Sequence, residues 1–120
     1  MAIAASSIAV AGVRSPVIDS GPADADEAVV IVHGTPGSGH DWDGLIAQLR
    51  DFARAVAPDM PGFGAADKPR GFDHTVEGYA GHLGAILEQL GVRRAHLVLH
   101  DLAARGGWHG RCPTPTRWRV

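Results

Sequence analysis

A run of five consecutive apolar residues, Ala28–Val32, constrains the fold of this chain more than any other feature. Four of the five are β-branched and no polar residue alternates with them, which is typical of a strand buried on both faces. Short apolar runs of the same kind lie within residues 54–57 and 96–100. Because such strands occur in parallel sheets that helices cover on both sides, the sequence predicts an α/β fold.

Two segments with helical periodicity separate these strands. The first covers residues 42–49, with Asp41 or Asp43 placed to cap its N-terminus. The second covers residues 75–90 and is followed by Gly91, where a C-cap glycine belongs. Strands that alternate with helices predict a parallel sheet with right-handed crossover connections.

The N-terminal residues predict an edge hairpin, with a strand at residues 8–13, a turn at Ser15-Pro16 and a short extended piece at Val17-Ile18. A chain of 120 residues is one small domain at most. We assign residues 1–102 to the N-terminal part of an incomplete domain. We expect residues 103–120 to form an unstructured tail, because they hold four arginines, no acidic residue and no hydrophobic period.

Charge and cysteine content exclude several classes of function. The net charge of −2 shows no excess of basic residues that would attract nucleic acid or an anionic membrane. No apolar run approaches the roughly 18 residues of a membrane span, and the N-terminus lacks the basic leader of a secretory signal. A single cysteine, Cys112, allows no internal disulfide. We therefore expect a cytoplasmic protein.

A glycine-rich turn, HGTPGSG at residues 33–39, follows the first buried run. A phosphate-binding loop would need a lysine and a hydroxyl residue after the last glycine, where the chain has His40 and Asp41. A dinucleotide-binding turn would need a third glycine where Trp42 stands. The remaining use is an oxyanion hole, which needs only backbone N–H groups. Residues 33–36 can supply them at the strand end where open α/β sheets bind ligands.

Asp101 directly follows the last apolar run. A carboxylate on a sharp turn between a strand and a helix is exposed for nucleophilic attack, and the N–H of Leu102 lies next to it to stabilise an oxyanion. Acids at strand ends also cap the helix that follows. Spacing alone leaves both interpretations of Asp101 open.

Three motifs in order resemble the α/β-hydrolase family, in particular its branch of epoxide hydrolases and haloalkane dehalogenases. They are VHGTP at residues 32–36 with Trp42, DMPGFGAADKP at residues 59–69, and LHDL at residues 99–102. The resemblance extends from about residue 28 to residue 102. It implies the N-terminal part of an α/β-hydrolase sheet, in which an edge hairpin precedes parallel strands and crossover helices.

The resemblance also implies roles for individual residues. It places the nucleophile at Asp101 and the oxyanion-hole backbone N–H groups at Thr35 and Leu102. His33 is expected to support the oxyanion loop through hydrogen bonds. Asp101 would attack an epoxide or carbon–halogen carbon to form an ester, which water then hydrolyses. The implied substrate is a small molecule, with no cofactor.

The chain departs from the family pattern after the nucleophile. Ala103 and Ala104 stand where the family has two glycines, and the later acid and the catalytic histidine do not follow. Read one base out of frame from Leu102, the codons can spell Gly-Gly, an apolar run and then His-Pro-Asp, which is similar to how the family continues. We therefore expect an inactive fragment, truncated by a frameshift just after the nucleophile.

Two further functions compete with the hydrolase interpretation. A non-catalytic binding module on the same fold is the alternative to a hydrolase, since fold does not determine function. A zinc site is not expected, because His96 and His100 share a strand face but lack a third ligand. The remaining histidines outside the tail are interpreted as surface or boundary residues: His40, His74 and His82.

Overall fold

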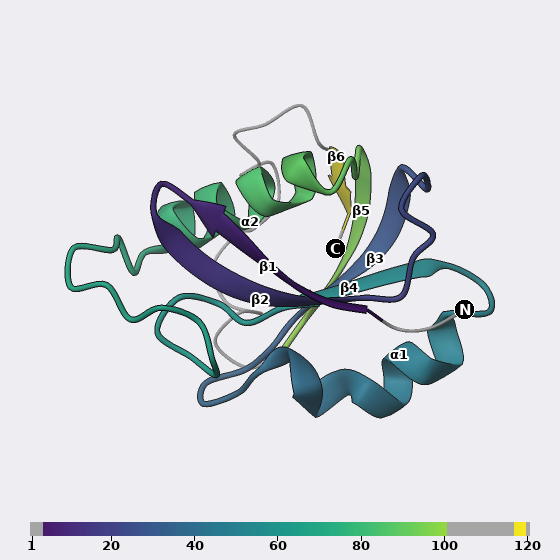
Figure 1. The fold of residues 1–120 in the computed structure, drawn as a ribbon, viewed down its shortest axis with the longest axis horizontal. Helices are drawn as coiled ribbons and strands as arrows, with labels where there is room; N and C mark the ends of the chain where they lie inside the picture. The colour runs from purple at the N-terminus through teal and green to yellow at the C-terminus, as the bar shows by residue number, and fades with distance from the viewer. Residues whose placement is uncertain (1–3, 101–116, 120) are drawn as a thin grey trace.

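The computed structural model describes residues 4–100 and 117–119. These residues form a six-stranded mixed sheet with the strand order β1-β2-β4-β3-β5-β6, shown in Figure 1. The strands are β1 (Ala4–Val10), β2 (Val13–Asp19), β3 (Glu27–Val32), β4 (Arg54–Pro58), β5 (Arg94–Leu99) and β6 (Arg117–Arg119). The helices are the short 3₁₀ helix η1 (Gly39–Trp42), α1 (Asp43–Leu49) and α2 (Val76–Gln89). The predicted α/β fold is therefore confirmed.

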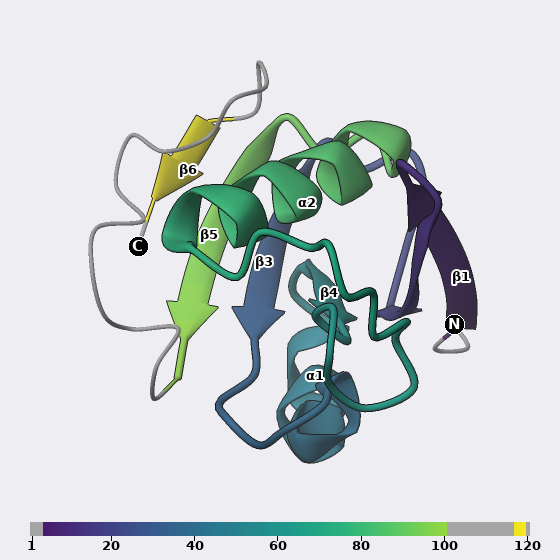
Figure 2. The same ribbon diagram turned by 90° about the vertical axis from the view of Figure 1, so that its left-hand side faces the viewer.

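The central strand β3 pairs in parallel with β4 on one side and with β5 on the other. Its side chains alternate between two buried clusters: Val30 and Val32 pack with residues of α2, whereas Ile31 packs with Ile46 of α1. The two helices cover opposite faces of the sheet, as Figures 1 and 2 show. Burial on both faces explains why this strand has no polar alternation.

The N-terminal hairpin turns at a different place from the one expected. The two residues between β1 and β2 are Ala11 and Gly12, with φ angles of 50° and 81°. Two positive φ angles in a two-residue loop define a type I′ turn, which matches the twist of a hairpin. Pro16 instead lies inside β2 opposite Ser7, so the predicted turn at Ser15-Pro16 is wrong.

The long helix α2 begins and ends as predicted. Thr75 is its N-cap, because the Thr75 hydroxyl accepts a hydrogen bond from the Gly78 N–H (3.1 Å). Gly91 follows the helix with a φ of 73°, a conformation that favours glycine. The start of the first helix differs from the prediction: η1 precedes α1, and the Asp41 carboxylate accepts from the N–H of its N-cap residue Ser38 (3.0 Å).

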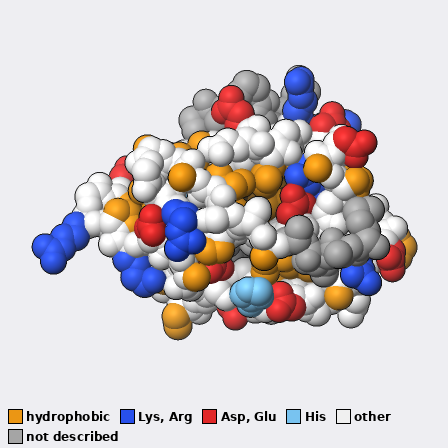
Figure 3. All heavy atoms as spheres, in the orientation of Figure 1, with side chains coloured by type: hydrophobic (Ala, Val, Ile, Leu, Met, Phe, Trp, Pro, Cys, Tyr) orange, Lys and Arg blue, Asp and Glu red, His pale blue; other side chains and the backbone are white. Residues whose placement is uncertain are grey.

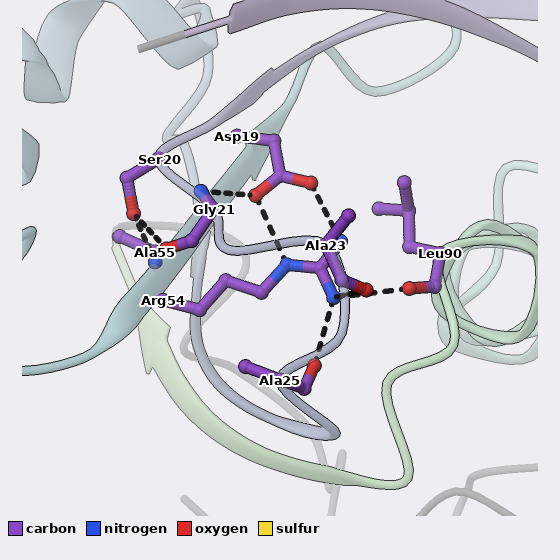
Figure 4. Close-up of polar contacts among 8 residues, drawn as sticks. All are labelled: Asp19, Ser20, Gly21, Ala23, Ala25, Arg54, Ala55 and Leu90. Atoms are coloured by element: carbon purple, nitrogen blue, oxygen red, sulfur yellow. Dashed lines mark hydrogen bonds and ion pairs between the residues drawn. The ribbon is translucent and has the colours of Figure 1, made fainter. Parts of the chain in front are cut away.

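A buried ion pair joins β2 to β4 at the amino end of the parallel strands (Figure 4). The Arg54 guanidinium binds both carboxylate oxygens of Asp19, at 3.0 and 2.7 Å. It also donates to the carbonyls of Ala25 (2.8 Å) and Leu90 (3.0 Å). The Arg54 side chain is only 1% exposed, so these acceptors replace the water that its charge has lost.

Part of the C-terminal tail is also described. Residues 117–119 form β6, which pairs in parallel with residues 94–96 of β5. The expectation of an unstructured tail does not hold for these three residues, because a free sheet edge offers N–H and C=O groups with which an extended segment can pair. Residues 103–116 and 120 lie outside the described residues, and the domain boundary at residue 102 stays a prediction.

Candidate active site

The loops that carry the first two motifs leave the same edge of the sheet. Residues 33–38 follow β3, residues 59–69 follow β4, and His100 follows β5. Figure 2 shows the ends of β3 and β5 pointing to this edge, next to α1. Ligands of open α/β sheets bind at the carboxyl ends of the strands, so this edge is the candidate site.

His33 is buried between these two loops, with 4% of its surface exposed. Its Nε2 lies 2.9 Å from the backbone nitrogen of Met60, and its Nδ1 lies 2.8 Å from the carbonyl oxygen of Gly34. A backbone N–H can only donate, so Nε2 must be the acceptor. Nδ1 therefore carries the proton and donates to Gly34. Both ring nitrogens of His33 are thus used in holding backbone groups.

Asp59 makes the reverse connection from the second loop to the first. One oxygen of its buried carboxylate accepts from the Gly39 N–H (2.7 Å), and the other accepts from the Ala65 N–H (2.9 Å). No role was predicted for Asp59. The sequence offered a signal, because Asp59 is an acid directly after the buried strand β4, just as Asp101 follows the last apolar run in the sequence. Charge-assisted hydrogen bonds of this kind are stronger than neutral ones.

Two glycines of the first loop are needed because other atoms come close. A Cβ on Gly39 would lie 2.6 Å from the carbonyl oxygen of Ala57, and one on Gly37 would lie 2.6 Å from that of Gly34. Real Cβ atoms do not approach oxygen so closely. The glycines therefore let the loop pack against β4 and against itself, which a glycine-rich loop can require without binding phosphate.

The end of β5 lies next to η1. The rings of Trp42 and His100 are 5.7 Å apart and nearly perpendicular, at 78°. The indole also packs on the cluster that contains Ile31 and Ile46. The Trp42 Nε1 atom is buried, and it has no hydrogen-bond partner among the described residues. Trp42 thus brings η1 next to His100, the residue that precedes Asp101 in the sequence.

The structure describes two of the four predicted site residues. His33 and Thr35 both lie on the loop after β3, where Thr35 is exposed and His33 is buried. Asp101 and Leu102 lie outside the described residues, so the nucleophile and the second oxyanion donor stay predictions. The role of Thr35 also stays a prediction.

His82 is buried, so its interpretation as a surface or boundary residue is wrong. It is 4% exposed on α2, and its Nε2 lies 2.8 Å from the Ser15 hydroxyl on β2. Desolvation by burial lowers the pKa of His82. The sequence signal was its position one residue before Leu83 in the buried stripe of the helix. Within residues 4–100 and 117–119, no group of three potential metal ligands comes together.

A pocket of about 470 Å³ lies at the opposite edge of the sheet, away from the candidate site. Its lining includes Phe52, Arg54 and His96, from the amino ends of β4 and β5. The His96 ring there pairs with Glu27 (2.8 Å). This pocket shares no residue with the two loops described above.

Comparison with known proteins agrees with the geometry. A family model described as "alpha/beta hydrolase fold" matches residues 27–109. The chain is 36% identical over 106 residues to a haloalkane dehalogenase of Bradyrhizobium diazoefficiens, covering 80% of this chain and 33% of the relative. It is 34% identical over 98 residues to a cis-3-alkyl-4-alkyloxetan-2-one decarboxylase of Xanthomonas campestris, covering 75% of this chain and 32% of the relative.

Solved structures give the same result. Epoxide hydrolase A from Mycobacterium thermoresistibile superimposes with a TM-score of 0.77 at 27% identity, covering 86% of this chain and 33% of that chain. An epoxide hydrolase from Vigna radiata superimposes with a TM-score of 0.75 at 31% identity, covering 85% and 33% of the two chains.

The fold, the two loops at the carboxyl edge of the sheet and these matches define the class of protein: this chain belongs to the α/β-hydrolase fold family. It spans about a third of the length of the curated relatives that it matches. No helix in the described part of the chain has the length and apolar character of a membrane span.

Proposed function

We propose that the complete protein to which this sequence corresponds hydrolyses an epoxide, a carbon–halogen bond or an ester, with Asp101 as the nucleophile. The observation that carries the proposal is the hydrogen-bonded pair of loops beside the end of β5. His33 and Asp59 hold the loop of Thr35 at the carboxyl edge, and Trp42 contacts His100, the neighbour of Asp101. Relatives named as haloalkane dehalogenases and epoxide hydrolases support this reaction class.

The proposed reaction has two steps. In the first, for a haloalkane or an epoxide, a carboxylate oxygen of Asp101 attacks the substrate carbon and the bond from that carbon to the halogen or epoxide oxygen breaks, so that halide leaves or the epoxide oxygen takes up a proton from water. This step leaves an ester between the protein and the substrate. In the second, water adds to the ester carbonyl carbon, and the backbone N–H groups of Thr35 and Leu102 stabilise the oxyanion. Collapse of this intermediate releases the alcohol and restores the Asp101 carboxylate.

The described residues suit the supporting roles in this scheme. His33 already uses both ring nitrogens for backbone groups, so it orients the loop and does not take the proton of the water. The proposed base for the second step is the family's later histidine, which the resemblance places after residue 102. We accordingly propose that the 120-residue chain carries the nucleophile without a base and is inactive in turnover.

The substrate, the partners and the cellular location are also proposals. A small molecule is the expected substrate. Nucleic acid is not an expected partner, and on the face shown in Figure 3 cationic and anionic side chains are interspersed. A cytoplasmic location stays a prediction from the single cysteine.

Restoring the reading frame after the Leu102 codon provides the test of the proposed function. We expect the restored protein to release halide from a haloalkane or diol from an epoxide, and the Asp101→Asn variant to lose that activity while keeping its fold. The amide has nearly the same shape as the carboxylate but is a poor nucleophile. A restored protein that folds and turns over none of these substrate classes would instead support a non-catalytic binding module.

A further inference from the structure

The residues after β4 begin with a tight turn, Met60–Phe63. The Phe63 N–H donates to the Met60 carbonyl (3.0 Å), and Gly62 has a φ of 91°. Proline restricts φ to about −65° at the second position, so the positive φ of the third residue defines a type II turn. Types I and II differ in the direction of the central peptide. Here that peptide joins Pro61 to Gly62.

Both polar groups of this central peptide have partners. The Gly62 N–H donates to the carbonyl of Asp67 (2.9 Å), which belongs to the same loop. The Pro61 carbonyl accepts from the hydroxyl of Tyr79 (3.2 Å), which belongs to α2. Tyr79 is itself fixed in the first turn of α2, where its N–H donates to the carbonyl of the N-cap residue Thr75 (3.0 Å).

The Pro61 carbonyl sets the direction in which the Tyr79 hydroxyl donates, and His74 is the second partner of that hydroxyl. Its Nδ1 lies 2.9 Å from the Tyr79 oxygen. The hydroxyl has one proton, and the Pro61 carbonyl can only accept, so the hydroxyl gives its proton to Pro61 and accepts one from Nδ1 of His74. Desolvation by burial raises the pKa of Tyr79, so the hydroxyl remains protonated at neutral pH.

The same turn contacts His33 through both of its ends. Met60, its first residue, donates to Nε2 of His33 (2.9 Å). Phe63, its last residue, places its ring edge-on to the His33 ring, with centroids 5.4 Å apart. Without the hydrogen bond to Tyr79 the turn is free to shift as a unit relative to α2, and such a shift moves both end residues. The orientation of His33 therefore depends on the position of this turn as well as on its own hydrogen bond to the Gly34 carbonyl.

We propose that Tyr79 is a positioning residue for the oxyanion loop, because its hydroxyl anchors the Met60–Phe63 turn to α2 through the Pro61 carbonyl and so keeps Met60 and Phe63 in contact with His33. The inference rests on the proposed role of residues 33–35. Its test measures the hydrogen bond between Met60 and His33 and needs no turnover, so the two proposals can fail separately.

The test uses the ¹⁵N-labelled 120-residue chain and the scalar coupling across the hydrogen bond from Met60 N–H to Nε2 of His33. We expect Tyr79→Phe, which removes only the hydroxyl, to weaken or abolish this coupling. The ¹⁵N chemical shift of His33 Nε2 should move toward the value of an imidazole nitrogen that accepts no hydrogen bond. Gln89→Ala is the matched control, since it removes a hydrogen bond from the other end of α2 to the Ala9 carbonyl (3.0 Å). This control should leave both signals unchanged.

A second variant tests the same turn from the other side. Gly62→Ala disfavours the positive φ of the turn, so it should weaken the same coupling. If Tyr79 acts through the turn, the double variant should show less change than the two single changes added together. The proposal is overturned if Tyr79→Phe leaves the coupling and the Nε2 shift as they are, if Gln89→Ala changes them equally, or if the two changes add.

Discussion

The backbone N–H of Met60 donates a hydrogen bond to Nε2 of His33 across 27 residues of chain. Asp59, the neighbour of Met60, accepts in return from the N–H of Gly39 on the loop of His33. The two loops thus hold each other by one side chain from each. Because both side chains are buried, the loop that supplies the proposed oxyanion hole is fixed before substrate arrives.

Loss of the His33 acceptor should destabilise the fold. His33→Leu leaves the buried N–H of Met60 without a partner, and we expect the free energy of unfolding to fall by about 1–3 kcal/mol. Urea unfolding followed by circular dichroism measures this change. His40→Leu, at an exposed position, is the control and should change the value by less than about 0.5 kcal/mol. Equal effects of the two variants would contradict the account of His33.

The buried ion pair of Arg54 and Asp19 should matter far more than the exposed pair of Arg14 and Asp67. Arg54→Met leaves the Asp19 carboxylate without its cation, and we expect a loss of about 3–5 kcal/mol, which can unfold a small domain. The Arg14–Asp67 pair has a distance of 3.9 Å and side chains 51% and 43% exposed. Arg14→Met should therefore cost only about 1 kcal/mol or less through this pair.

The comparison of Arg54→Met with Arg14→Met uses thermal and urea unfolding under the same conditions. Similar midpoints for the two variants would show that the contacts of Arg54 are not a major source of stability.

Stability should fall in mild acid because of His82. Its folded-state pKa lies below the ordinary value of 6.5, so the unfolded chain binds a proton at a higher pH than the folded chain does. The contribution is therefore complete above about pH 6.5 and decreases as the pH falls below that value. Unfolding free energies measured between pH 5 and pH 8 should show this decrease, and His82→Gln should flatten it.

His40→Gln provides the comparison for His82, because His40 is an exposed histidine beside Asp43. The His40→Gln variant should still lose unfolding free energy as the pH falls below about 6.5. If the His82→Gln variant also loses it to the same extent, groups other than His82 cause the pH dependence.

The purified 120-residue chain should hydrolyse neither epoxides nor haloalkanes above background. The described residues provide a loop for the oxyanion, whereas the proposed base is the family's later histidine, and loss of the base stops turnover even when the nucleophile remains. Sustained product formation would contradict the proposed truncation.

Much of the fold could be predicted because its strongest signals are local. The β-branched residues of β3 and the apolar period of α2 are each read from neighbouring positions, and both elements are confirmed. The hairpin turn was misplaced because Ser15-Pro16 is a stronger turn signal than Ala11-Gly12. Proline is nevertheless tolerated within β2, where its carbonyl still accepts from the Asp59 N–H (2.9 Å).

The site could be predicted less completely because its geometry depends on contacts between distant segments. Asp59 and Gly39 are 20 residues apart, and His82 and Ser15 are 67 apart. These side chains find their partners only when folding brings the distant segments together. The helical position of His82 indicated burial, but its hydrogen-bond partner Ser15 is not apparent from the sequence, so His82 was interpreted as a surface or boundary residue.

The most direct measurement of the central claim is a single turnover in heavy-oxygen water by the frame-restored protein. If Asp101 attacks the substrate carbon, water adds to the carboxyl carbon of the ester, so labelled oxygen enters the protein before it enters product. Mass spectrometry should then find the label on the peptide that contains Asp101 and unlabelled oxygen in the first product. If the label instead enters the first product directly and Asp101→Asn keeps the full rate, Asp101 only caps the following helix, and the nucleophile assignment is wrong.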